Sequence, residues 1–253
     1  MKDYEIYSNL KVPKNSKIIL RLDGRKFHTL TRKFNLSKPY DDNFASLMTE
    51  VSKDIFNEFS PKFIYTFSDE ISILLDEIPF SGRVEKINSI FSSLASSSFT
   101  FHLINEFKEN MGIDITDDDL KSVVLPISFD SRIIPIPCDE IPDYFKWRQD
   151  EAWRNCINAY GIWVLKKEYS SELANQKIHG LNSSDIHELL FKKGINLNNE
   201  PTWRKRGIGI YKKSYNIKGY NPLLKKETES TRYKLFVDLE LDIFNKTFFK
   251  SFI

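Results

Sequence analysis

The pattern of hydrophobic and polar positions starts with an apolar run at residues 17–22, which is short, contains β-branched side chains and predicts a buried strand. Asp23-Gly24 follows it directly and is a turn signal. Between residues 44 and 55, apolar side chains recur in steps of 3, 1, 3 and 4, which indicates one face of a helix. Asp41 or Asp42 is placed to cap this helix.

Two further apolar runs, at residues 62–67 and 71–75, predict strands joined by a tight hairpin at Ser68-Asp69-Glu70. A long helix is expected at about residues 83–107, and another strand at residues 128–136. The resulting order is strand, helix, two strands, helix, strand. This order predicts an α+β fold of the ferredoxin-like β-α-β-β-α-β type, with a four-stranded antiparallel sheet and two helices on one face. RNA-recognition modules and polymerase palms share that plan, so the fold alone does not choose between them.

The rest of the chain is expected to be mostly helical. Apolar residues have helical spacing at residues 143–168, a short helix is expected to end near Gly194, and one further strand is indicated at residues 208–211. We therefore predict a ferredoxin-like domain at residues 1–137, which is the catalytic domain if the plan is that of a palm, and a helical region at residues 138–253 that packs on it.

Composition narrows the class of protein. The chain has 253 residues, 41% of them hydrophobic, which is enough for one large domain or two small ones. No apolar run approaches the roughly 20 residues of a membrane-spanning helix, and the N-terminus does not resemble a signal peptide. Only two cysteines are present. These features predict a soluble cytoplasmic protein without a disulfide framework.

The charge is unevenly distributed. The net charge is only +2, yet residues 200–234 contain ten basic and three acidic residues, with tryptophan and tyrosine among them. Cations interleaved with aromatic side chains suit a phosphate backbone with unstacked bases. A solvated basic surface beside a loop is the alternative interpretation.

Three acidic residues stand at the ends of predicted strands. Asp23 ends the first strand, and Asp69 and Glu70 lie at the hairpin tip. The first and third strands are neighbours in this fold, so we expect these carboxylates to converge on one sheet edge. Such a site suits Mg²⁺, and two ions would activate the attacking oxygen and stabilise the leaving one. Each motif taken alone is also compatible with an ordinary solvated turn.

The residues after Asp23 suit a triphosphate. Gly24 lets the backbone approach a ligand closely, and Arg25, Lys26 and Lys38 could neutralise phosphate charge. His28 could serve as an acid-base or stacking group, or could be structural. No P-loop sequence occurs, which disfavours an ordinary NTPase.

These residues resemble the family of tRNA-His guanylyltransferases and their relatives, the 3′-to-5′ polymerases. The matching motifs run from Arg21 to His28 and continue with Lys38-Pro39, Ser68-Asp69-Glu70 and Trp147-Arg148-Gln149. Weaker matches are Gly180, Asn196-Leu197-Asn198-Asn199-Glu200 and Arg206-Gly207.

The resemblance implies a palm-like fold with two Mg²⁺ ions, held by Asp23 and Asp69 with help from the Gly24 carbonyl, and a site supported by Glu70. It also implies that ATP activates the tRNA 5′-phosphate and that GTP then adds a nucleotide, within a homotetramer built as a dimer of dimers. The catalytic residues would be Asp23, Asp69 and Glu70. The residues that would bind the nucleotide are Asp23, Gly24, Arg25, Lys26, Phe27, His28, Lys38, Ser68 and Asp69. Contacts to tRNA are predicted for Arg204, Lys205, Arg206, Lys212 and Lys213.

Two departures from the family pattern stand out. Eukaryotic members carry His-Ile-Asn-Asn-Leu-Tyr-Asn after Trp-Arg-Gln, where this chain reads Trp153-Arg154-Asn155-Cys156-Ile157-Asn158-Ala159. Tyr40 stands where the eukaryotic pattern has asparagine after Lys-Pro. The first departure is similar to the archaeal and bacterial branch, which adds nucleotides at the 5′ end under direction of a template. The resemblance therefore covers both G−1 addition to tRNA-His and 5′-end repair of tRNA.

Two rival functions remain at this point. A noncatalytic RNA-recognition module would not need Asp23 or Asp69, and anions at the strand ends would repel RNA. A nucleotidyl cyclase uses a similar palm and two metals, but it would not need the basic, aromatic region at residues 200–234.

Overall fold

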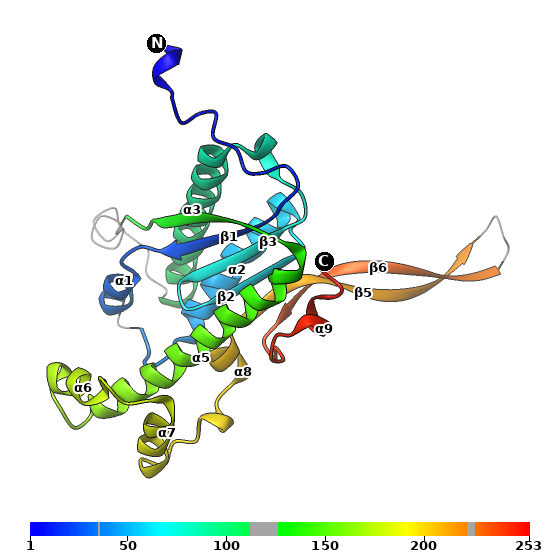
Figure 1. Ribbon diagram of the computed structural model, residues 1–253. Helices are drawn as coiled ribbons and strands as arrows, with labels where there is room; N and C mark the ends of the chain where they lie inside the picture. The colour runs from blue at the N-terminus through cyan, green and yellow to red at the C-terminus, as the bar shows by residue number, and fades with distance from the viewer. Residues whose placement is uncertain (35, 112–125, 222–225) are drawn as a thin grey trace.

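The computed structural model describes residues 1–34, 36–111, 126–221 and 226–253. Its centre is an antiparallel sheet with the strand order β4-β1-β3-β2-β5-β6 (Figure 1). The first four strands in that order are β4 (Phe129–Ile136), β1 (Lys17–Gly24), β3 (Glu70–Leu75) and β2 (Phe63–Phe67). This is the order of a ferredoxin-like sheet, so the predicted fold class is confirmed.

Two long helices cover one face of the sheet. They are α2 (Asp42–Phe59) and α3 (Val84–Met111), which lie behind the strands in Figure 1. Asp41 caps α2, because its side chain accepts a hydrogen bond from the backbone N–H of Phe44 at 2.9 Å. Alternate residues of the central strands, such as Ile18, Leu20 and Leu22, point into the core that these helices close.

The opposite face of the sheet is covered as well. Helix α5 (Ile141–Leu165) crosses it, and the short helix α9 (Lys246–Phe249) packs beside α5. Ile19, Phe63 and Tyr65 point to this side and bury against Phe145 and Phe244. The sheet is thus the middle of three layers, and residues of α5 border the cavity at the edge that carries Asp23 and Asp69.

The remaining helices are short and peripheral. They are α1 (Phe27–Lys33), α6 (Ser171–Ile178), α7 (Ser183–Lys192) and α8 (Thr202–Arg206). Single 3-10 turns occur at Lys2–Tyr4, Pro79–Gly82, Cys138–Glu140 and Leu197–Asn199. The second half of α5 packs on α7 in a separate apolar cluster that contains Cys156 and Tyr160.

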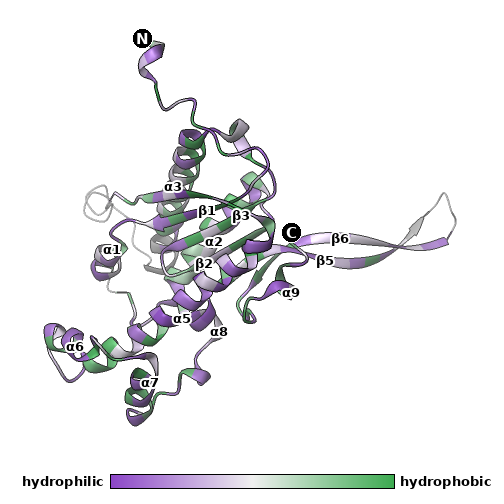
Figure 2. Ribbon diagram, viewed as in Figure 1, coloured by the Kyte–Doolittle hydropathy of each residue, from purple (hydrophilic) through white to green (hydrophobic). Residues whose placement is uncertain are grey.

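The C-terminal third is less helical than the sequence predicts. The expected strand at residues 208–211 continues as β5 (Ile208–Asn221), and β6 (Lys226–Asp238) pairs with it along its length. Only the first residues of β5 join the sheet, through β2, and the outer part projects away from the body as a two-stranded ribbon (Figure 1). Hydrophobic residues concentrate on the central strands and are sparse along the ribbon (Figure 2). Its polar, exposed sequence carries no strong apolar alternation, which is why the pattern did not reveal it.

A membrane span was not expected. Within the described part of the chain, no helix has both the length and the apolar character needed to cross a bilayer.

Candidate functional site

The structure brings Asp23 and the hairpin tip together. Asp23 at the end of β1 lies opposite Glu70 in the antiparallel register, and Asp69 immediately precedes that partner. The backbone N–H of Gly24 donates a hydrogen bond to the carbonyl oxygen of Asp69 at 3.0 Å. The sequence therefore predicted correctly that these strand ends share one edge of the sheet.

Gly24 is required at this edge for a steric reason. A Cβ atom at position 24 would lie 2.5 Å from the ring of Phe27 and 2.9 Å from the Cβ of Asp69. Contacts this short do not occur between carbon atoms without displacement, so only glycine lets the two strand ends approach. The glycine thus sets the spacing of the acidic residues.

The turn that carries Asp69 contains one residue, Ser68, with an unfavourable backbone conformation. Ser68 has φ 51°, a left-handed conformation that is uncommon for residues other than glycine. Its hydroxyl donates to the Asp69 carboxylate at 3.1 Å. The hydrogen bond orients the carboxylate that faces Asp23.

The electrostatics of Asp69 fit a cation site. Burial raises the pKa of the Asp69 carboxyl above its usual range, and the negative charge of Asp23 adds to this increase, whereas His28 lowers it. Two carboxylates that repel each other in a partly buried edge favour a divalent cation between them. Across the described residues, no group of three or more acidic, histidine or cysteine side chains is arranged to hold a metal ion.

Glu70 was expected to be a third carboxylate of the acidic site, but in the structure it is paired with an arginine. Its carboxylate receives two hydrogen bonds from Arg148 of α5, at 2.8 Å from Nε and 2.5 Å from Nη2, and both side chains are 9% exposed. The Ser72 hydroxyl also donates to it at 3.3 Å. Burial raises the pKa of the Glu70 carboxyl, and the hydrogen bonds from Arg148 oppose that rise. Glu70 therefore ties α5 to the hairpin instead of offering free oxygens.

The loop after Asp23 is split between surface and core. Arg25, Lys26 and His28 are exposed, and Lys26 has φ 60° at the start of α1. Phe27 is 4% exposed, and its ring meets Phe44, Phe99 and Phe129 edge-on. The side chain of Phe27, predicted to bind a nucleotide, is thus a core residue whose ring is not available to a ligand.

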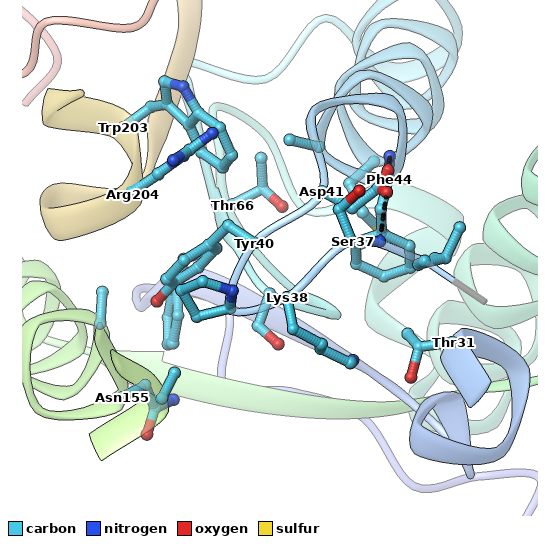
Figure 3. A pocket seen from close by; sticks show the side chains of 18 of the residues that line it. Thr31, Ser37, Lys38, Tyr40, Asp41, Phe44, Thr66, Asn155, Trp203 and Arg204 are labelled. Carbon is cyan, nitrogen blue, oxygen red and sulfur yellow. Dashed lines mark hydrogen bonds between the residues drawn. The ribbon is translucent and has the colours of Figure 1, made fainter. Parts of the chain in front are cut away.

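Two adjacent cavities open beside the acidic edge. One, of about 400 Å³, is lined by Asp23, Asp69 and Glu70 together with Arg21 and Trp147. The other, of about 380 Å³, lies between the Lys38-Pro39 loop, α2, α5 and α8 (Figure 3). Phe67, Ser68 and Asn155 line both cavities, so the two volumes adjoin at the hairpin.

The second cavity contains residues for which the sequence predicted no role. Its walls include Tyr40, Trp203 and Asn155, and Lys38, predicted to bind the nucleotide, also lines it. The peptide bond between Lys38 and Pro39 is cis. Trp147-Arg148-Gln149 matched the family motif, but only the packing of α5 across the sheet shows that Arg21 and Trp147 border the acidic cavity.

Comparison with known proteins decides the family. The tRNAHis guanylyltransferase family model matches residues 1–137, and the model of the Thg1 C-terminal domain matches residues 139–240. The chain belongs to the tRNAHis guanylyltransferase family. This is a family of nucleotidyltransferases, so the predicted enzyme class is confirmed.

Relatives of this family cover nearly all of the chain. A Dictyostelium discoideum protein named probable tRNA(His) guanylyltransferase is 33% identical over 260 residues, covering 98% of this chain and 95% of that protein. The tRNA(His) guanylyltransferase of Saccharomyces cerevisiae is 30% identical over 204 residues, covering 78% of this chain and 82% of that protein.

Solved structures of the family have the same fold. A bacterial guanylyltransferase-like protein in complex with ATP has a TM-score of 0.71 and 28% identity, covering 96% of this chain and 92% of that one. The same kind of protein in complex with GTP has a TM-score of 0.68 and 29% identity, covering 96% and 91%. Those relatives thus bind both nucleotides.

The basic residues predicted to bind tRNA lie on two elements, α8 and the first part of β5. Arg204 forms ion pairs with Asp42 at 3.0 Å and with Glu200 at 3.1 Å, and its side chain is 21% exposed. Lys205 donates to the carbonyl of Asn198 at 3.0 Å, and Arg206 donates to the carbonyl of Leu241 at 3.0 Å. These three side chains brace α8 against its neighbours, and the predicted contacts of Arg204, Lys205 and Arg206 with tRNA stay a prediction.

Lys212 and Lys213, the other two basic residues predicted to bind tRNA, lie on β5. Both are exposed at the base of the ribbon, where they line a separate cavity with Lys62 and Tyr233. The period-2 alternation of a strand points them to opposite faces of the ribbon.

Proposed function

We propose that this chain is a magnesium-dependent nucleotidyltransferase that adds a nucleotide, guanylate from GTP, to the 5′ end of tRNA in the 3′-to-5′ direction. The observation that carries the proposal is the approach of Asp23 to Asp69 beside two adjoining cavities. Because the chain belongs to a family of nucleotidyltransferases, we interpret this acidic edge as the site of nucleotide transfer. G−1 addition to tRNA-His and template-dependent 5′-end repair are both included.

The chemistry requires two displacements at phosphorus. In the first, an oxygen of the tRNA 5′-phosphate attacks the α-phosphorus of ATP, and pyrophosphate leaves as the bond to the β-phosphate breaks. In the second, the 3′-hydroxyl oxygen of GTP attacks the 5′-phosphorus of the activated tRNA, its proton passes to solvent, and AMP leaves. Mg²⁺, held by Asp23, Asp69 and the Gly24 carbonyl, would supply activation of the attacking oxygen and stabilisation of the leaving one.

The protein's own residues bind and orient the nucleotide. The cavity beside Tyr40 and Trp203 has room for a nucleoside, and Ser68 joins it to the acidic edge where the triphosphate would lie. Exposed Arg25 and Lys26, together with Lys38, would neutralise phosphate charge. His28 is exposed on α1, in the segment that follows Asp23.

One face of the ribbon is suited to a nucleic-acid backbone. The strand register places Lys213, Lys226, Arg232 and Lys234 on one face of the ribbon. Asp238 has the same parity, but it pairs with Gly209 where β5 joins the sheet, and its carboxylate accepts a hydrogen bond from the Tyr211 hydroxyl. The other face carries Lys212 and Lys218 with Glu227 and Glu229. Contacts within the cationic face agree with this alternation, since Lys234 lies 5.8 Å from the ring of Tyr215. We propose that tRNA phosphates lie along the cationic face.

An assay with RNA tests the function. The protein is incubated with labelled ATP, GTP, Mg²⁺ and a set of tRNAs that lack their first nucleotide. Lengthened tRNA is the expected product, and the tRNA species that respond decide between tRNA-His maturation and general repair. A cyclic nucleotide would instead identify a cyclase, and tight RNA binding without either product would identify a binding module; both results would refute the proposal.

Two further features belong to the proposal. We infer a homotetramer, built as a dimer of dimers, from the family resemblance, and light scattering of the purified protein measures its mass directly. We also infer a cytoplasmic location, which suits the two free cysteines, Cys138 and Cys156. Fluorescent tagging in cells tests this location.

A further inference from the structure

We propose that the exposed side of α1 around Arg32 binds the sugar-phosphate backbone of the RNA next to its reacting 5′ end, whereas the ribbon binds a part of the RNA farther from that end. The proposal rests on the function proposed above, because it assumes that the 5′ end lies at the edge that carries Asp23 and Asp69. It gives an RNA-binding role to Arg32, for which the sequence predicted none.

The segment that follows Asp23 is rich in positive charge. Residues 24–40 contain five basic residues and no acidic residue. The side chains of Arg25, Lys26 and Arg32 are exposed, and none of the three forms an ion pair with an acidic side chain of the described residues. These cations are therefore available to an anionic ligand.

Packing on the core decides which side of α1 faces outward. Phe27 and Leu30 are 4% and 3% exposed, and they lie one turn apart on the buried side of the helix. Arg32 lies on the exposed side, one turn after His28, so these two side chains are neighbours on the surface. Because the buried side is anchored in the core, the fold itself fixes where Arg32 lies relative to the acidic edge.

The ribbon extends away from the acidic edge. Strand β5 begins at Ile208, which pairs with Thr66 close to the hairpin, and it runs from there toward the other end of the sheet. Lys213, on the cationic face of the ribbon, is about 17 Å farther along this extended strand. In Figure 1, α1 and the ribbon lie on opposite sides of the body. RNA whose 5′ end lies at the acidic edge therefore meets α1 before it meets the ribbon.

The position of Arg32 along α1 distinguishes it from the cations assigned to the nucleotide. Arg25 and Lys26 precede the helix, whereas Arg32 lies about 8 Å along the helix axis from its first residue. The triphosphate of a nucleotide at the acidic edge already has Arg25, Lys26 and Lys38 to neutralise its charge. An RNA strand carries further phosphates beyond its reacting end, and the planar guanidinium of an arginine is well suited to bind one of them.

The two basic surfaces should respond differently to the length of the RNA. An acceptor-stem hairpin has phosphates only near the 5′ end, whereas a full-length tRNA also extends to the ribbon. Arg32→Gln should therefore weaken the binding of both RNAs. The ribbon variant Lys213→Gln/Lys234→Gln should weaken the binding of full-length tRNA much more than that of the hairpin.

Fluorescence anisotropy of 5′-monophosphorylated RNA, measured without nucleotide, tests binding independently of turnover. Arg32→Gln should raise the Kd of the acceptor-stem hairpin about 2- to 5-fold. It should also reduce the slope of log K against log salt by up to about 0.9. Lys14→Gln is the matched control and should change neither quantity, because Lys14 is exposed and precedes β1 at the end of that strand away from Asp23. Arg32→Lys keeps the charge and should keep the slope.

Neutral linkages in the RNA locate the contact. Methylphosphonate linkages after the first and second nucleotides remove the charge of these phosphates and leave the 5′-phosphate intact. The wild-type protein should bind the modified hairpin about 2- to 5-fold more weakly than the unmodified one. Arg32→Gln should bind the two hairpins nearly equally, because the variant has already lost the contact. The same linkages placed in the loop of the hairpin are the control.

The outcomes separate RNA binding from other roles of Arg32. In steady-state assays, Arg32→Gln should raise KM for tRNA and leave KM for ATP and GTP unchanged. A raised KM for ATP or GTP with unchanged RNA binding would place Arg32 at the nucleotide and overturn the proposal. Lower thermal stability with unchanged RNA binding would show that Arg32 only stabilises α1, and equal weakening of RNA binding by Arg32→Gln and Lys14→Gln would also overturn the proposal.

The proposed function fails separately. Wild-type protein that binds the RNA through Arg32 but adds no nucleotide to it would refute the transfer reaction and leave the RNA-binding surface on α1 in place.

Discussion

Glu70 and Arg148 form a buried bidentate ion pair between the hairpin that carries Asp69 and α5, with oxygen–nitrogen distances of 2.8 and 2.5 Å. The guanidinium also lies over the rings of Trp147 and Phe67, at 4.5 and 5.4 Å from their centroids. The pair thus connects the turn that presents Asp69 to the helix that borders both cavities. The pair therefore fixes this turn relative to α5.

Breaking this pair should destabilise the protein. Replacing one partner leaves the other charge buried, so Glu70→Gln or Arg148→Met should each lower the free energy of unfolding by about 3–5 kcal/mol. The double variant Glu70→Gln/Arg148→Met should recover part of the loss, because no buried charge remains. Urea unfolding of the three variants measures these differences.

The exposed pair of Lys146 and Asp150, on the same helix, is the matched control. Lys146→Met should change the free energy of unfolding by no more than about 1 kcal/mol. Equal losses from the buried and the exposed pair would contradict the structural role given to Glu70.

Asp69 should be required for the reaction and not for folding. Asp69→Asn keeps the size of the side chain but removes the charge that we assign to metal binding, and loss of several kcal/mol of transition-state stabilisation corresponds to a rate at least about 100-fold lower. Single-turnover nucleotide addition measures the effect. Asp76→Asn, at an exposed aspartate paired with Lys62, should leave the rate unchanged.

Near-normal addition by Asp69→Asn would show that the metal assignment is wrong. Binding of Mn²⁺, followed by its paramagnetic effect on water relaxation, gives a second readout that does not depend on turnover. The wild-type protein should bind Mn²⁺ more tightly than Asp69→Asn.

Gly24 should not tolerate a methyl group. Gly24→Ala places a Cβ within 2.5 Å of Phe27 and 2.9 Å of Asp69, and such overpacking costs about 1–3 kcal/mol of stability. We expect lower activity as well, because relief of the clash separates Asp23 from Asp69. At Gly219, in the ribbon, no atom lies within 4 Å of the place that a methyl group would occupy, so Gly219→Ala should leave both stability and activity nearly unchanged.

Thermal unfolding measures the stability of the two glycine variants, and single-turnover rates measure their activity. A stable, fully active Gly24→Ala protein would mean that the two strand ends need not be so close.

The two faces of the ribbon should contribute unequally to tRNA binding. Lys213→Gln/Lys234→Gln removes two charges from the cationic face and should reduce the slope of log K against log salt by up to about 2 units. Lys212→Gln/Lys218→Gln removes the same charge from the mixed face and should change the slope little. Titrations of tRNA at several salt concentrations give both slopes, and equal slopes for the two variants would exclude a face-specific contact.

The placement of the acidic edge could be predicted from sequence because it depends on local patterns. Asp23 ends a buried strand and Asp69 lies in a two-strand turn, and the β-α-β-β order makes those strands neighbours. Tight hairpins and the order of elements leave few alternatives for such a pair.

The partners of individual side chains could not be predicted in the same way. Phe27 lies within a motif associated with nucleotide binding, yet its ring is buried among other phenylalanines. Arg204 belongs to a basic run, yet it is engaged by Asp42 and Glu200. Each outcome depends on residues far away in sequence, which no local pattern specifies.

By itself, the sequence determined the ferredoxin-like order of elements, the acidic strand ends and the family, because alternating hydrophobicity, turn residues and short motifs are local properties of the chain. Only the tertiary structure decided that Glu70 belongs to Arg148, that Tyr40 lies against the cluster around Cys156, and that the basic C-terminal stretch divides between a braced helix and a projecting ribbon. The physical reason is that packing and ion pairing join side chains from separate elements, and their geometry exists only once α5 and α8 have docked on the sheet.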